Sequence, residues 1–223
     1  IKMKNIENNI KILLNLFAAT KYDLVISKSK KLIRENPEYL ILYNILGSAY
    51  QNVGNLYSAK EIFSNGLKLV PNNISIMNNL GNVYKNIGEI TLAENLFRKI
   101  VQIKPSYINA YINHGNLKRD NNDFQSAINL YSSALKINDK MPVTLYSLAL
   151  AYQGLGEFEF AIKYAKKTLL IDPKFTQADL LISQSIKYKH GNKHFDEMSL
   201  KINTLELKSD QKVNLLFAIA KAN

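Results

Sequence analysis

The chain is 223 residues long and carries 29 Lys and Arg against 18 Asp and Glu, which gives a formal net charge of +11. It has no cysteine, which excludes a disulfide framework, a Cys-based zinc site and a thiol nucleophile. Hydrophobic residues make up 47% of it, enough for a sizeable core, yet no stretch approaches the roughly 18 uncharged apolar residues of a membrane span. No secretory signal is visible, so we expect a basic, helix-compatible chain in the cytoplasm.

A period of 34 residues runs through most of the chain. The small residue of this repeat is Gly47, Gly81, Gly115 and Ala149. Alanine recurs at Ala59, Ala93, Ala127 and Ala161, and an aromatic residue recurs at Phe63, Phe97 and Tyr131. The prolines are Pro37, Pro71, Pro105 and Pro173, with Asp139 in the same phase. Because one register holds all of these sets, we expect a single supersecondary element repeated along the chain.

The residue types in this register resemble those of the tetratricopeptide repeat family. A 34-residue repeat of that family has a small residue after Leu, followed by Tyr, Ala, Phe and Pro. The blocks that carry the pattern here are Tyr43-x-x-Leu46-Gly47-x-x-Tyr50 and Met77-x-x-Leu80-Gly81-x-x-Tyr84. The resemblance implies an all-α fold, a right-handed solenoid of antiparallel helix pairs, with helices A and B in each repeat. It also implies a role in protein–protein interaction.

Five repeats are expected in chain order, over residues 6–39, 40–73, 74–107, 108–141 and 142–175. The first lacks the Gly and Ala signatures, as an end repeat with a solvent-facing outer side can. Helix A of the later repeats should end at Gly54, Gly88, Asn122 and Gly156, which tolerate the left-handed backbone of a C-terminal cap. The small residue at the glycine position should let helix B approach helix A closely.

Residues 176–223 depart from the register and predict an irregular helical cap. We expect a helix from Thr176 to about Lys189, a break at 190–193, a shorter helix over 194–205 and a last helix over 213–222. The last helix resembles a helix A without its helix B, so its apolar stripe should be uncovered. We therefore expect the chain to be part of a longer protein with a downstream domain.

The cap adds a narrower resemblance. The irregular helices around 193–205, the polar Ser209-Asp210 start and the apolar block 215–222 are similar to the N-terminal region of bacterial tetratricopeptide-repeat sulfotransferase-like proteins. In those proteins the repeats precede a domain that transfers sulfate from a phosphoadenosine donor. No strand–loop–helix phosphate site occurs here, so the resemblance implies that any such activity lies outside these 223 residues.

A polar stripe is the candidate binding site. Side chains at positions 2, 5, 6, 9, 12 and 13 of each repeat should point from helix A to the concave face. The candidate groove residues are Asn44, Asn78, Asn79, Asn82, Lys85, Asn86, Asn113, Asn116, Arg119 and Tyr146. An asparagine amide both donates and accepts hydrogen bonds, so it can pair with a peptide backbone. The stripe resembles the asparagine ladder of the O-GlcNAc transferase family. The alternative is an ordinary solvated face in an Asn-rich chain.

Other kinds of site have less support. Position 2 and position 6 of the repeats lack the Lys and Arg with which some family members clamp a C-terminal carboxylate. The lysines are spread rather than gathered with aromatics, so we expect no nucleic-acid and no membrane partner. His190 and His194 flank Gly191-Asn192, which disfavours a metal-binding helix, and His114 replaces a core Leu. We expect no catalytic residue, cofactor or metal in this chain.

Three functions remain open. The first is a protein-interaction module that binds an extended peptide or a helix in the Asn-rich groove. The second is the substrate-recruiting part of a sulfotransferase-type or other transferase whose catalytic domain lies elsewhere. The third is an assembly scaffold that forms a weak homodimer through its C-terminal helix.

Overall fold

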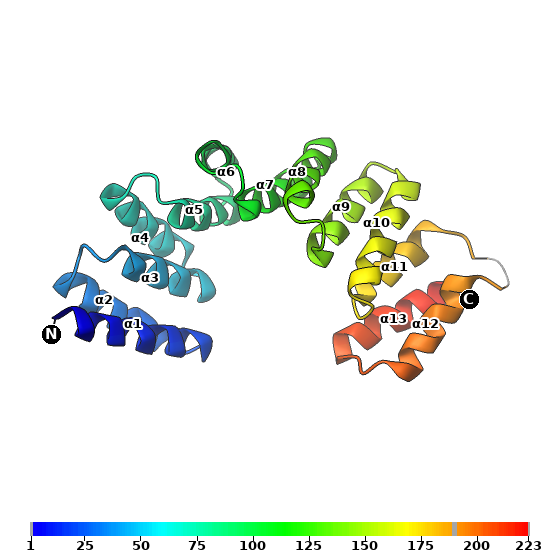
Figure 1. Cartoon of the computed structure of the whole chain (residues 1–223), viewed down its shortest axis with the longest axis horizontal. Coiled ribbons are helices and arrows are strands. Elements are labelled where there is room, and N and C mark those ends of the chain that lie inside the picture. The colour runs from blue at the N-terminus through cyan, green and yellow to red at the C-terminus, as the bar shows by residue number, and fades with distance from the viewer. Residues whose placement is uncertain (1, 189–190, 223) are drawn as a thin grey trace. The chain divides into compact units, whose positions relative to one another are not determined.

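The computed structural model describes residues 2–188 and 191–222, and the regular structure in these ranges is entirely helical. Thirteen helices are described there, and Figure 1 shows them in order along the chain. The first six are α1 (Lys2–Ala18), α2 (Tyr22–Glu35), α3 (Leu40–Asn52), α4 (Leu56–Leu69), α5 (Ile74–Asn86) and α6 (Ile90–Ile103). The others are α7 (Ile108–Asp120), α8 (Phe124–Ile137), α9 (Pro142–Gly154), α10 (Phe158–Ile171), α11 (Thr176–Ser185), α12 (Lys193–Thr204) and α13 (Ser209–Ala222). The predicted all-α class is confirmed.

The chain divides into two compact units, unit 1 up to Ala110 and unit 2 from Tyr111 onward, with the boundary inside α7. In unit 1, successive helices pack against each other from α1 to α6, and in unit 2 the same holds from α8 to α11. Because the connections are short, neighbouring helices run antiparallel, as the paired ribbons of Figure 1 show within each unit. Both units are therefore built from helical hairpins.

The turns from helix A to helix B follow the predicted backbone conformation. Gly54, Gly88 and Gly156 have φ values of 77°, 83° and 79°, and Asn122 has a φ of 61°. The C-terminal caps expected at these four positions are confirmed. The next residue then opens helix B in two of the repeats, because Asn55 and Asp123 each accept a hydrogen bond from the backbone N–H three residues on, at 3.2 Å.

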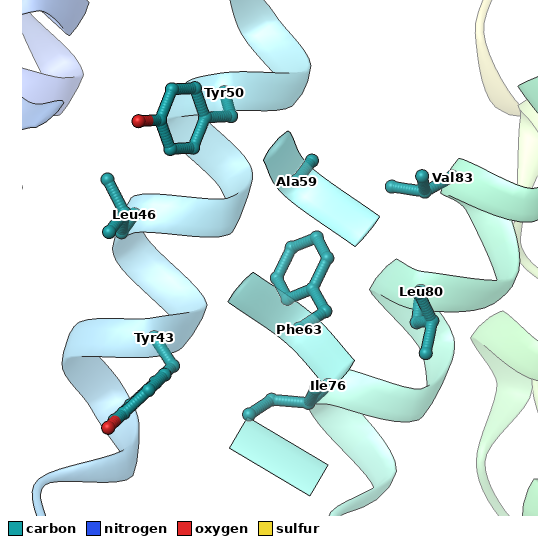
Figure 2. Packing of buried hydrophobic residues seen from close by; sticks show 8 residues of the cluster. All are labelled: Tyr43, Leu46, Tyr50, Ala59, Phe63, Ile76, Leu80 and Val83. Carbon is teal, nitrogen blue, oxygen red and sulfur yellow. The ribbon is translucent and has the colours of Figure 1, made fainter. Parts of the chain in front are cut away.

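One core cluster of unit 1 forms around the ring of Phe63, which lies between α3 and α5 in Figure 2. Its neighbours in this cluster are Tyr43, Leu46, Tyr50, Ala59, Ile76, Leu80 and Val83. The next repeat places the ring of Phe97 against Gly81, where an added Cβ would lie 2.6 Å from the nearest ring atom. Glycine is therefore needed for the close approach of helix B, as the sequence predicted.

The fifth repeat fills the space between its two helices with a different pair of residues. In unit 2, a Cβ on Gly115 would lie 2.7 Å from the ring of Tyr131. One repeat later the glycine is replaced by Ala149 and the aromatic residue by Ala165, both of them fully buried. A larger residue on helix A thus accompanies a smaller one on helix B. The two positions share one fixed volume, as expected of a closely packed interior.

The C-terminal cap differs from the prediction in two respects. The first helix, α11, ends at Ser185 rather than near Lys189, and Ile186 is extended at φ −125° and ψ 155°. The Ser185 hydroxyl donates to the Leu181 carbonyl oxygen at 2.8 Å, an alternative bond that weakens a helix end. Lys189 and His190 lie outside the described residues.

The second difference concerns the last helix. We expected the apolar stripe of 213–222 to be uncovered, but α13 packs against α11 and α12 and buries Leu215 and Ala218 completely. In the sequence α12 lies between α11 and α13, and α13 folds back to pack directly on α11. Only the opposite side of α13 remains exposed, including Leu216 at 54% and Phe217 at 64%. The expectation was therefore wrong for the side that faces α11.

Candidate functional site

In unit 1, side-chain amides form a hydrogen-bonded row across two neighbouring A helices. Asn79 on α5 donates from Nδ2 to Oδ1 of Asn44 on α3, at 2.8 Å. Asn44 donates in turn from its Nδ2 to Oγ of Ser75, at the longer distance of 3.5 Å. Asn44 and Asn79 are both half-buried, so the row lies at the surface and is also held in place. The structure thus brings together two predicted groove residues from adjacent repeats.

The other predicted residues of unit 1 lie on α5 with different exposures. Asn82 and Lys85 are half-buried and Asn86 is exposed. Asn78 is only 7% exposed, although Asn44 occupies the same position in the preceding repeat. A buried amide can reach a ligand only after being uncovered. Asn78 is therefore part of the packing in this structure and is left out of the ligand-contacting set.

In unit 2, a tyrosine from the core fixes one of the predicted asparagines. Tyr131 on α8 donates its hydroxyl to Oδ1 of Asn116 on α7, at 2.7 Å. Burial raises the pKa of Tyr131 to about 12, so the hydroxyl stays a proton donor at neutral pH. The bond occupies the oxygen of Asn116 and orients its NH₂ group, which is a hydrogen-bond donor. Asn113 lies on the same helix and is half-buried.

Arg119 and Tyr146 complete the predicted set in unit 2. Arg119 pairs with the adjacent Asp120 across 3.0 Å between Nη2 and Oδ1, an arrangement that leaves the guanidinium half-buried. Tyr146 on α9 packs against Phe175, with ring centroids 5.0 Å apart. Burial raises the pKa of Tyr146, against the opposing effect of the positive charge of Arg119. The phenol is therefore a neutral hydrogen-bonding group.

The candidate groove residues do not include three residues that organise these side chains, although the register places Ser75 and Asp120, at positions 2 and 13, on the same face. Ser75 and Tyr131 are direct hydrogen-bond partners of predicted residues, and Asp120 partly neutralises Arg119. A signal was present for Ser75, because position 2 of one repeat faces position 5 of the repeat before it. No sequence signal indicated that the core residue Tyr131 reaches α7 with its hydroxyl. Its aromatic position predicts packing, and packing alone.

The strongest buried polar cluster of the described residues lies in the C-terminal cap. Asp179 on α11 is fully buried and accepts from Lys201 Nζ at 2.7 Å and 2.9 Å. His194 Nε2 lies 3.2 Å from the same carboxylate, and His194 Nδ1 contacts the Tyr188 hydroxyl. Burial raises the pKa of Tyr188 to about 12, and the nearby Asp179 carboxylate adds to the effect. The contacts of Asp179 with Lys201 and His194 tie α12 to α11.

Metal binding and membrane insertion have no structural support in the described ranges. Residues 2–188 and 191–222 contain no group of three or more His, Cys, Asp or Glu side chains placed to hold a metal ion. His194 is engaged with Asp179 and Tyr188, and His190 is outside the described residues. His114 is buried, as predicted for a packed imidazole. In the same part of the chain, every helix is too short or too polar to cross a lipid bilayer.

Together, the hairpins, the fixed glycine–aromatic contacts and the polar A-helix faces define a helical repeat protein. The sequence model of the tetratricopeptide repeat matches residues 41–73, 74–107, 108–141 and 143–175, which is more than half of the chain. The chain therefore belongs to the tetratricopeptide repeat family. The four matches coincide with the second to fifth expected repeats to within a residue. Residues 6–39, the expected first repeat, are outside the matches and form α1 and α2.

Solved structures share the fold. A crystal structure of MamA protein is similar with a TM-score of 0.63 at 23% identity, over 75% of this chain and 92% of that one. TTC0263, a thermophilic tetratricopeptide repeat protein of Thermus thermophilus, gives 0.66 at 18% identity, over 80% and 97%. MamA 41-end from Desulfovibrio magneticus RS-1 gives 0.66 at 17% identity, over 76% and 96%. No curated protein matched the chain. At these identities the likeness establishes the fold alone.

Proposed function

We propose that this chain is a protein-interaction module that binds an extended peptide or a helix through the side-chain amides of its A helices. The observation that carries the proposal is the bonded row of Asn79, Asn44 and Ser75 in unit 1. Each amide in the row uses only part of its hydrogen-bonding capacity on its neighbour. The remaining N–H and oxygen positions are held in a fixed orientation, which lowers the entropy lost on binding a peptide backbone.

Unit 2 supports the same proposal with a second set of groups. The NH₂ group of Asn116 is oriented by the bond from Tyr131, and the guanidinium of Arg119, which Asp120 partly neutralises, lies on the same helix. Amides, a guanidinium and a neutral phenol can together recognise main-chain carbonyls of a bound peptide. They contain no nucleophile paired with a base, and so they favour binding over catalysis.

The test is a paired substitution, one in each unit. A displayed library of random peptides is first selected against the unmodified chain, and the affinity of a selected peptide is then measured by isothermal titration calorimetry. Asn79→Ala with Asn113→Ala should weaken binding roughly tenfold, because a lost hydrogen bond is worth about 0.5–1.5 kcal/mol. Asn95→Ala with Asn129→Ala is the matched control, since these two exposed asparagines lie on the B helices α6 and α8.

Two results with these variants would decide against the groove. Equal affinity for the unmodified chain and the Asn79/Asn113 variant would remove the basis of the proposal. An equal loss in the Asn95/Asn129 control would point to a general effect of removing asparagine. A loss of helical signal in circular dichroism would call for the same measurement with Asn116→Ala. A loss of affinity that persists in that variant sustains the proposal, and unchanged affinity rejects it.

A second candidate, self-association, has its own observation. The outer side of α13 exposes Val213, Leu216 and Phe217. Asp210 lies in the first turn of this helix and Lys221 in its last turn. Two copies of α13 packed antiparallel would bury the apolar residues and place each Asp210 opposite a Lys221. Sedimentation velocity should then show dimers that Phe217→Glu abolishes, and a monomer at every concentration would reject this arrangement.

A recruiting role for a sulfotransferase-type or other transferase rests on the sequence resemblance of residues 193–222 alone. The peptide-binding proposal does not depend on it. Reading the gene past the codon for Asn223 separates the two: a following domain with a phosphosulfate-binding loop would make these repeats its recruiting part.

A further inference from the structure

Two hollows flank α10, the helix B of the fifth repeat, in unit 2. The first, of about 610 Å³, lies between α10, α11 and α12 and is lined by Ile162, Leu169, Ile182 and Ile186 among others. The second, of about 550 Å³, lies between α8, α9 and α10 and is lined by Leu135, Leu145, Leu148 and Ile171 among others. Both are mainly apolar, and both include Leu170 of α10. These two hollows and Leu170 are called the α10 surface below.

Leu170 is the central feature of the α10 surface. Its side chain is 83% exposed, although it borders both apolar hollows. A single exposed leucine is common on proteins and carries no meaning by itself. Here, however, it forms a ridge between two concave apolar surfaces. A partner that covered the ridge and filled both hollows would bury all three together.

The charge around the α10 surface is positive. Lys166 lines the first hollow, Lys136 and Lys140 line the second, and none of them forms an ion pair within the described ranges. Lys167 also lines the second hollow and lies 5.3 Å above the ring of Tyr164. The acidic side chains lining the two hollows are Glu197 and Asp139.

The remaining two lysines of the first hollow are already neutralised. Lys193 pairs with Glu197 at 3.5 Å, and Lys201 pairs with the buried Asp179 at 2.7 Å. The net positive charge therefore comes from the four lysines on α8, α10 and the turn after α8, reduced by the carboxylate of Asp139. An acidic partner would gain favourable electrostatic energy here, and a basic one would be repelled.

We infer that the α10 surface is a second docking site, for an acidic amphipathic peptide segment of another protein. Hollows on both sides of a ridge match apolar side chains that project from a helix at intervals of three or four residues. A lipid bilayer is flat and would leave both hollows unfilled. A second copy of this chain, with its net charge of +11, lacks the acidic character that the four lysines of this surface favour.

This inference does not rest on the proposed groove. The α10 surface is lined by residues of α8 to α12, whereas the candidate amides of unit 2, Asn113 and Asn116, lie on α7. Substitutions at the two sites can therefore be made independently, and either site can fail while the other is retained.

The test uses a yeast-displayed library of 18-residue helical peptides. Apolar residues vary at i, i+3, i+4 and i+7, and the other positions vary among Asp, Glu, Lys, Arg and Ser. We expect sorting against the unmodified chain to enrich Asp and Glu. Leu170→Ser should weaken a selected peptide about tenfold or more, because the leucine loses its burial under the peptide. Lys136→Ser with Lys166→Ser should weaken it severalfold and reduce its dependence on salt.

The chain offers matched controls on other surfaces. Leu200→Ser removes a leucine that is 63% exposed on α12 and lines neither hollow. Lys99→Ser with Lys212→Ser removes two exposed lysines on α6 and α13. Both controls should leave the affinity of the selected peptide within a factor of about two, since surface changes away from a site have small effects. Because Leu170 is so exposed, its replacement should leave the unfolding transition in place.

Several outcomes would overturn the inference. Enrichment of basic or uncharged peptides would reject the predicted chemistry, and so would a library that yields no peptide discriminating the unmodified chain from Leu170→Ser. Binding to vesicles with phosphatidylglycerol that Leu170→Ser abolishes would assign the surface to lipid. A dimer in sedimentation velocity that Leu170→Ser dissociates would assign it to a second copy.

Discussion

Replacement of Gly81 by alanine tests the packing argument most directly. An added Cβ at this position would lie 2.6 Å and 2.9 Å from the two nearest ring atoms of Phe97, well inside ordinary contact distance. Phe97 is fully buried, so its ring has no free space to move into. Overpacking of this kind costs about 1–3 kcal/mol. Alanine in a helix interior is favoured over glycine by about 1 kcal/mol.

The two terms have opposite signs, and their sum gives the expected result. Because the overlap is about 1 Å and the ring is enclosed, we place the overpacking cost in the upper half of its range. Gly81→Ala should therefore lower the free energy of unfolding by about 1–2 kcal/mol. The measurement is urea-induced unfolding followed by circular dichroism, with the midpoint of the transition compared between variants.

A second background separates overpacking from every other effect of the substitution. In a Phe97→Leu variant the ring is gone, so the same Gly81→Ala change should become neutral or stabilising, by up to about 1 kcal/mol. Ala149→Gly is the reciprocal control, because its partner on the next helix is Ala165 rather than an aromatic residue. It should cost about 1 kcal/mol with no gain from released crowding. Equal effects of Gly81→Ala in both backgrounds would refute the reasoning.

Two further predictions concern charged side chains. Lys201→Met should lower the stability of the cap by about 3–5 kcal/mol in urea unfolding, because it leaves the fully buried Asp179 carboxylate without its cation, and adding Asp179→Asn should recover part of the loss. No recovery in the double variant would contradict this role. Asp123→Ala should cost about 1 kcal/mol at pH 7, whereas Asp123→Asn keeps the helix cap. The hydrogen bonds from Ser126 and the charge of Lys118 lower the pKa of Asp123, so its charge-dependent stabilisation is present above about pH 4 and is lost as the pH falls through the folded-state pKa. The difference in stability between the unmodified chain and Asp123→Asn should therefore shrink from pH 7 to pH 3, and a constant difference would count against the assignment.

The repeated part of the fold was predictable because its determinants are local and recur. Gly54, Gly88 and Gly156 mark turns through a backbone conformation that glycine adopts easily, and the structure has positive φ at each. The helix A and helix B bounds then follow from the period. The four family matches cover residues 41–175 except residue 142, and they follow the same 34-residue register.

The cap was less predictable because its determinants are contacts between distant residues. The sequence of α13 resembles a helix A without its helix B. In the structure α13 is nevertheless covered, because it packs on α11, two helices earlier in the chain. The carboxylate of Asp179 pairs with Lys201, 22 residues further along the chain. No periodic signal links these two positions. The candidate groove was predictable in part. The period predicts which side chains share a face, but it cannot indicate that Asn78 is buried.

The repeat itself explains why one chain can carry two independent surfaces. Within each repeat, the glycine, alanine and aromatic positions are committed to the interior, as Gly81, Ala93 and Phe97 show by their complete or nearly complete burial. Most outward positions of both helices are under no such demand, although Asn78 shows that one of them can be buried. On the A helices these positions hold amides, and on α10 they hold lysines beside Leu170. Because the two surfaces use different outward side chains, either set can be substituted without replacing a residue of the other. A family defined by its interior positions thus leaves partner specificity to a few outward side chains, which is why the family assignment follows from the period while the partner must be found by experiment.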